Sequence, residues 1–85
     1  MLKPSISSWN LGYGFGTGEL GLFEARVEFV KNREQAIRLA RKDFQFRMAN
    51  RKVKIHSIKT TMIFWNKKFN FKHYIVDIYY LPRNR

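Results

Sequence analysis

The chain has 85 residues, no cysteine and a formal net charge of +11 at pH 7. This length makes one domain with a modest core, and the lack of cysteine excludes disulfides and thiolate metal sites. No apolar run reaches the roughly 18 residues of a transmembrane helix, and Met1–Ser8 lacks the apolar core of a signal peptide. We therefore expect a cytoplasmic or viral protein that is not secreted.

The positive charge is concentrated in the second half of the chain. Residues 1–43 hold seven Lys/Arg and five Asp/Glu, whereas residues 44–85 hold ten Lys/Arg and a single acid, Asp77. A segment with a net charge of +9 attracts polyanions such as RNA, DNA or an acidic protein surface. Solubility alone rarely needs such an asymmetry.

Residues 1–19 are predicted to form a Gly-rich and aromatic N-terminal arm. Glycines at positions 12, 14, 16 and 18 alternate with aromatic or hydroxyl residues, which makes the segment costly to order. It is either mobile or extended against another surface, with Trp9, Tyr13 and Phe15 as interface residues. The G-x-G-x-x-G spacing that ends at Gly21 lacks the preceding strand and following helix of a dinucleotide site.

Residues 20–82 are predicted to form one β-α-β-β domain, followed by a basic tail at 83–85. Residues 22–30 alternate between apolar and charged side chains, as a half-buried strand does. Asn32 is expected to cap a helix that runs from Arg33 to about Asn50 and has Gln35 in the capping-box position. The apolar residues of this helix that recur with a period near 3.6 are Ala36, Ile37, Ala40, Phe44 and Met48.

Residues 53–65 and 69–81 are predicted to form a long hairpin in which rings alternate with cations. A two-residue turn at Asn66-Lys67 would sort the side chains onto two faces. The core face would carry Ile58, Met62, Phe64, Phe69, Phe71 and Ile75. The wet face would carry Lys59, Thr61, Ile63, Trp65, Lys68, Asn70, Lys72 and Tyr74.

The apolar pattern of both hairpin strands changes phase, near Ser57 in one strand and near Val76 in the other. A single bulge would shift only one strand, so we expect a three-stranded, mostly antiparallel α+β sheet that buries opposite faces at its two ends. One helix cannot cover both faces, and a homodimer with Val30, Leu39 or Phe46 at its edges is the preferred cover. A different partner protein or a larger assembly is the other possibility.

Catalytic and metal-binding residues are not expected in this sequence. The two histidines, His56 and His73, have no cysteine and few acids beside them. No nucleophile is marked by a neighbouring base, and Glu24 and Glu28 flank Arg26 as in an ordinary solvated strand. We expect a protein without a cofactor that is not an enzyme.

Two functions compete. The first is a small nucleic-acid-binding protein, either a ribosome-like component or an accessory factor of a phage or mobile element. Its expected contact residues are Arg38, Arg41, Lys42, Arg51, Lys59, Trp65, Lys68, Lys72 and Tyr74. The second is a protein-interaction module, an assembly subunit or inhibitor that docks on an acidic partner. Its expected interface residues are Trp9, Tyr13, Phe15, Leu39, Phe46, Val76 and Ile78.

Overall fold

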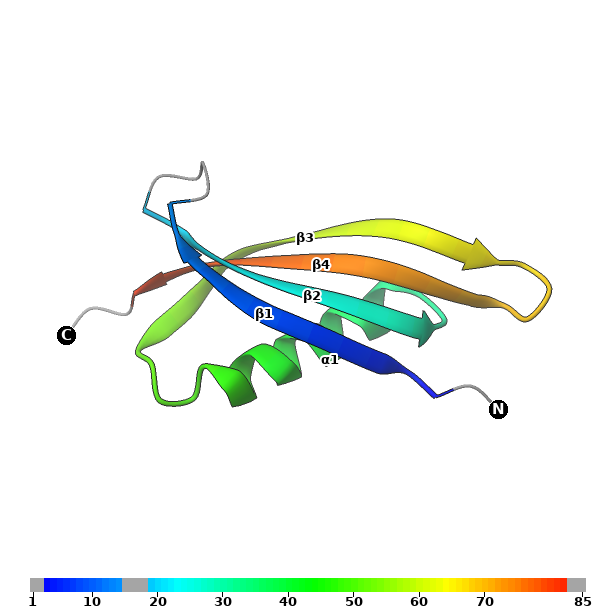
Figure 1. The fold of residues 1–85 in the computed structure, drawn as a ribbon, viewed down its shortest axis with the longest axis horizontal. Helices are drawn as coiled ribbons and strands as arrows, with labels where there is room; N and C mark the ends of the chain where they lie inside the picture. The colour runs from blue at the N-terminus through cyan, green and yellow to red at the C-terminus, as the bar shows by residue number, and fades with distance from the viewer. Residues whose placement is uncertain (1–2, 15–18, 83–85) are drawn as a thin grey trace.

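The fold is an antiparallel sheet with one helix packed against it (Figure 1). The structure is a computed structural model that describes residues 3–14 and 19–82. Its elements are β1 (Ser5–Tyr13), β2 (Gly21–Val30), α1 (Arg33–Arg47), β3 (Val53–Asn66) and β4 (Phe71–Pro82). The strand order is β1-β2-β4-β3, and every neighbouring pair is antiparallel.

The predicted α+β class with one helix on the sheet is confirmed, but the sheet has four strands and not three. The extra strand, β1, comes from the segment expected to be an arm. It pairs with β2 from Ser5 opposite Glu28 to Tyr13 opposite Gly21. Phe15 and the rest of 15–18, like the predicted tail at 83–85, lie outside the described residues.

Polar side chains hold β1 in place, which explains why hydrophobic alternation did not reveal it. The Ser8 hydroxyl donates a hydrogen bond to the Asp43 carboxylate on α1. The Tyr80 hydroxyl donates to Asn10 Oδ1 at 2.6 Å. Both bonds lie on the helix side of the sheet, so β1 is fixed by hydrogen bonds more than by apolar burial.

The helix starts where the sequence predicted. The Asn32 side chain accepts a hydrogen bond from the Gln35 backbone N–H at 2.8 Å, and Gln35 Oε1 accepts one from the Lys31 N–H at 2.8 Å. One unpaired N–H of the first helical turn and the N–H of the residue before the cap are therefore satisfied at this end. The helix ends at Arg47, earlier than expected, and a turn leads through Arg51 to β3.

The core lies between α1 and one face of the sheet, which we call the covered face. Phe44 packs edge-on against Phe23 with centroids 5.1 Å apart, and its ring lies 5.6 Å from that of Tyr80. Gly21 is required beside Tyr80, because a Cβ there would meet the ring at 2.3 Å. The buried core residues are Phe23, Ala25, Val27, Val30, Ala36, Ala40, Phe44, Met48, Tyr74, Val76, Ile78 and Tyr80.

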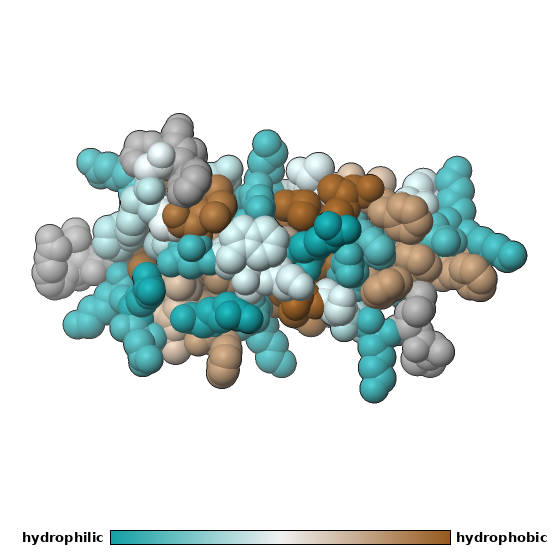
Figure 2. All heavy atoms as spheres, viewed as in Figure 1, coloured by the Kyte–Doolittle hydropathy of each residue, from teal (hydrophilic) through white to brown (hydrophobic). Residues whose placement is uncertain are grey.

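The opposite face of the sheet, the open face, has no element packed on it among the described residues. The strand register places side chains in rows across this face. One row runs Trp9, Glu24, Asp77 and Lys59, and the next runs Ser7, Arg26, Ile75 and Thr61. Figure 2 views the molecule from this side and shows apolar and polar side chains interspersed along the sheet.

Two register shifts in β3 overturn the predicted sorting of side chains. One lies between Ile55 and Ser57, and the other between Met62 and Phe64. The shift after Ile55 keeps Ile55 and Ile58 on the covered face. The phase change in the apolar pattern of β3 is therefore the result of a bulge. The second moves Phe64 to the open face opposite His73, away from Ile58 and Met62.

In β4 the phase change in the apolar pattern has another cause: the apolar side chains at the two ends of the strand lie on opposite faces of the sheet. This strand stays regular, so Val76, Ile78 and Tyr80 face the helix while Phe71 and Ile75 face the open side. A third register shift, in β2, gives Phe29 a left-handed backbone with φ of 60°. Its ring then meets Phe71 at 5.1 Å and His73 at 4.8 Å, and these contacts offset the unfavourable backbone conformation.

The end of the β3–β4 hairpin projects beyond the helix and beyond the end of β2 (Figure 1). Its turn spans Lys67–Asn70, four residues and not the predicted two at Asn66-Lys67. Asn70 adopts φ of 57°, a conformation in which Asn is enriched, and Asn66 Oδ1 accepts the Phe69 N–H at 3.0 Å. The end of the hairpin that carries this turn, Met62–Lys72, is called the hairpin tip below.

Candidate nucleic-acid interface

The hairpin tip gathers most of the exposed apolar side chains. Among the described residues, eight large hydrophobic side chains are exposed, and five of them lie between Met62 and Phe69. Phe69 is the most exposed of these five at 67%. The tip also carries Lys67, Lys68 and Lys72, and its sequence contains no acid.

The lysines of the tip lie over its rings. Lys67 Nζ is 4.9 Å and Lys72 Nζ is 5.3 Å from the centroid of the Trp65 ring. Lys68 Nζ is 5.5 Å from the Phe69 ring. Lys72 Nζ also donates to the Lys31 carbonyl at 3.2 Å, which ties the tip to the start of the helix. The tip therefore presents cations and π faces within a few ångströms of each other.

Tyr74 is not part of this surface, and its predicted stacking role is wrong. It is only 6% exposed and faces the helix beside Val27 and Val76. Burial raises the pKa of its hydroxyl above the usual value for tyrosine. The error follows from the β3 bulge, because Tyr74 pairs with Met62 on the covered face.

The remaining predicted contact residues lie on separate surfaces. Trp65, Lys68 and Lys72 share the tip. Lys59 sits on the open face opposite Asp77, and Arg51 lies in the turn after α1, at the other end of β3 from the tip. The predicted set of nine residues is therefore not one interface.

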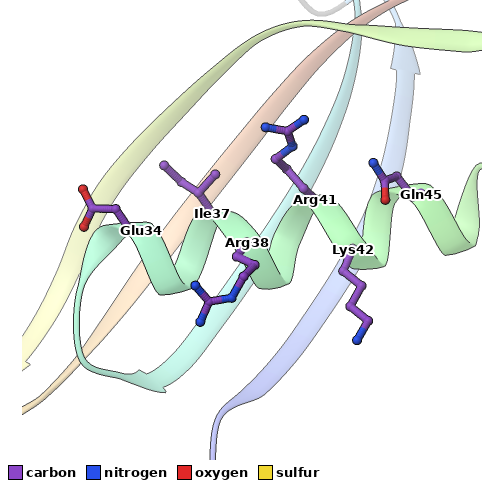
Figure 3. Close-up of a pocket in the computed structure, with 6 residues that line it drawn as sticks. All are labelled: Glu34, Ile37, Arg38, Arg41, Lys42 and Gln45. Atoms are coloured by element: carbon purple, nitrogen blue, oxygen red, sulfur yellow. The ribbon is translucent and has the colours of Figure 1, made fainter.

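Arg38, Arg41 and Lys42 form a second basic surface on α1. They line a shallow groove of about 410 Å³ together with Glu34, Ile37 and Gln45. All six residues belong to the same helix, so the groove is an open surface. Figure 3 shows Arg38 and Lys42 pointing away from Arg41, so the three cations do not converge on one point.

The open face carries an acid pair at its centre. Glu24 and Asp77 are cross-strand partners in β2 and β4. A side-chain hydrogen bond with Asp77 is the main reason that the pKa of Glu24 lies above its usual value, with burial and the charge of Asp77 adding to it. Asp77 Oδ1 is buried without a hydrogen-bond partner, which adds to the cost of two ionised carboxylates at this place.

The Glu24→Gln variant is expected to be more stable than the wild type at neutral pH. The raised folded-state pKa means that the folded protein binds the proton more tightly, so wild-type stability falls as pH rises through this pKa. Glutamine supplies the N–H donor permanently. Thermal melts should show the largest gain in melting temperature at pH 7 and a smaller gain near pH 4.5. An equal gain at both pH values would contradict a proton held between Glu24 and Asp77.

The residues predicted for a protein interface also do not form one surface. Trp9 and Tyr13 are 41% and 50% exposed, and Phe46 is 82% exposed. Leu39 and Phe46 line a groove of about 320 Å³ with Ile6, Lys42 and Asp43. Val76 and Ile78 are fully buried beneath the helix, as is Val30, so their predicted interface role is wrong.

Two features of the site escaped the sequence analysis. Lys67 was considered only as a turn residue, although its ammonium group also lies over the Trp65 ring. The rings of Phe29, Phe64, Phe71 and His73 form a cluster on the open face, with His73 Nδ1 3.9 Å from Glu28. The high aromatic density of 64–74 was the available signal, but the bulge that separates Phe64 from Met62 has no mark in the sequence.

Within residues 3–14 and 19–82, no group of three or more metal-ligating side chains is found. No helix in the same residues is long and apolar enough to span a membrane. Comparison with known proteins gave no matching family model, no similar curated protein and no similar solved structure.

Proposed function

We propose that the protein binds single-stranded nucleic acid through the hairpin tip. The observation that carries this proposal is the pairing of exposed rings with lysines. Trp65 and Phe69 are 47% and 67% exposed, and three lysine ammonium groups lie within 5.5 Å of their centroids. Unpaired bases stack on such rings while neighbouring cations attract the phosphates.

The alternatives on this molecule fit a polyanion less well. The open face carries the acids Glu24, Glu28 and Asp77, which repel phosphates. The helix groove offers cations but no exposed ring. It is a second phosphate contact for a strand already held at the tip, and the expected sequence preference is weak.

Removing the two turn lysines should flatten the salt dependence of binding. About five neutralised phosphates on a single strand would give a log–log slope near −3.5. The variant Lys67→Gln/Lys68→Gln should reduce the magnitude of this slope by about 1.4, because each contact contributes about 0.7. The measurement is a fluorescence anisotropy titration of a random-sequence oligonucleotide at several salt concentrations.

The matched control is Lys52→Gln/Lys54→Gln, which removes the same charge at the other end of β3. Its slope should change by less than that of the tip variant. Equal changes in the two variants would show that only overall charge matters. No binding by the wild type at low salt would refute the proposal.

A protein partner is the second candidate, and one observation favours it. Phe46 stands 82% exposed beside Leu39 and Ile6 in the groove between α1 and β1. An apolar anchor that is this exposed is typical of a docking site. An acidic partner would suit the surrounding positive charge. If the nuclease-treated protein binds no oligonucleotide, this candidate replaces the first.

A further inference from the structure

We infer that the open face of the sheet is a self-association surface, on which a second copy of this chain packs face to face. The first reason is its composition. Among the described residues, eight apolar or aromatic side chains face this side, although a sheet face in water is normally polar. They are Trp9, Leu22, Phe29, Phe64, Phe71, Ile75, Tyr79 and Leu81.

The second reason is charge, and it identifies the occupant. Where all four strands run together, the open face carries three acids and two cations, a net −1, so all other charged residues of the chain sum to +12. This excess of positive charge disfavours an approach of two copies through the basic surfaces of the chain. The open face therefore offers a second copy a nearly neutral surface.

The third reason is that the charges on this face can complement their own copies. Glu24, Arg26 and Glu28 alternate along β2, and Arg26 Nε is already 2.8 Å from Glu28 Oε2. Consider a two-fold axis that lies in the plane of the contact, runs perpendicular to the strands and passes between Glu24 and Arg26. It places the Arg26 of each copy opposite the Glu24 of the other copy. Such an isologous contact is the commonest form of a closed dimer.

The available area is sufficient for a stable contact. Four strands spaced about 4.8 Å apart over their shared length make a patch of roughly 500 Å² in projection. Because side chains project from the sheet, the accessible area of the patch is larger than its projection. It is closer to the roughly 800 Å² that each partner buries in a standard interface. Two stacked sheets would leave both helices on the outside, and Trp65 of each hairpin tip, which faces the helix side, would stay outside the contact.

The test is the molar mass of nuclease-treated protein at physiological ionic strength, measured by light scattering over a range of concentrations. We expect the wild type to approach twice the 10.3 kDa of one chain as concentration rises. Ile75→Lys places a charge at the centre of the face and should give a monomer whose circular dichroism is unchanged. Phe46→Lys, in the groove between α1 and β1 on the helix side of the sheet, should remain a dimer.

A charge exchange tests the two-fold pairing itself. Arg26→Glu should weaken dimerisation about tenfold or more, and the double variant Glu24→Arg/Arg26→Glu should restore it. If Ile75→Lys does not fold, Trp9→Lys makes the same test at a side chain already 41% exposed. A wild type that stays at 10.3 kDa, or a dimer that survives the lysine on this face, would overturn the inference. Oligonucleotide binding at the tip is measured separately and does not depend on this result.

Discussion

Replacing Trp65 and Phe69 together by alanine is expected to weaken binding of single-stranded nucleic acid by about 1–3 kcal/mol for each stacking ring lost. Both rings are roughly half or more exposed and belong to the projecting tip, so their removal takes little packing from the core. The unfolding midpoint should therefore move little. Anisotropy titration gives the affinity, and a denaturant titration monitored by circular dichroism gives the stability.

The control for this double variant is Phe46→Ala, which removes an even more exposed ring from the helix. Its affinity for the oligonucleotide should match that of the wild type. Equal losses in both variants would mean that ring exposure alone, and not the tip, governs binding. Unfolding of the Trp65→Ala/Phe69→Ala protein would show that these rings are structural.

Phe44→Ala is expected to destabilise the fold by about 3–5 kcal/mol. The Phe44 ring is 3% exposed and contacts both Phe23 and Tyr80, so truncation leaves a cavity between helix and sheet. A small domain has only about 5–15 kcal/mol of total stability, so this variant should be partly unfolded on mild heating. Urea titration of the two proteins measures the difference.

Phe46→Ala serves as the matched control here as well, because it makes the same substitution two residues further along the same helix. Exposed positions usually change stability by no more than about 0.5 kcal/mol. Comparable losses of stability in the Phe44 and Phe46 variants would contradict the observed orientation of the helix, in which Phe44 faces the sheet and Phe46 faces solvent.

The elements with strong local signals could be predicted from the sequence. Period-2 alternation located β2, and Asn32 with Gln35 located the start of the helix, because these signals depend on neighbouring residues alone. β1 carried no such signal. Its position depends on pairing with β2 and on side-chain hydrogen bonds with Asp43 and Tyr80, which are distant in the sequence.

The candidate site was predicted only in part, for a related reason. Trp65, Lys68 and Lys72 were correctly placed near the turn, because aromatic and cationic density is a local property. Which face each side chain takes depends on strand register, and one inserted residue reverses it. The bulge after Met62 therefore placed Tyr74 in the core and Phe64 outside it.

The same bulges have a consequence for the solubility of the protein. β3 is an edge strand of 14 residues, and its outer backbone groups could template the addition of strands from other molecules. The register shifts after Ile55 and after Met62 divide its pairing into short regular stretches, of which Ser57–Met62 is the longest. Lys59 stands within that stretch. The irregular edge thus discourages the open-ended growth of a shared sheet, while the exposed rings at its end remain available to a partner.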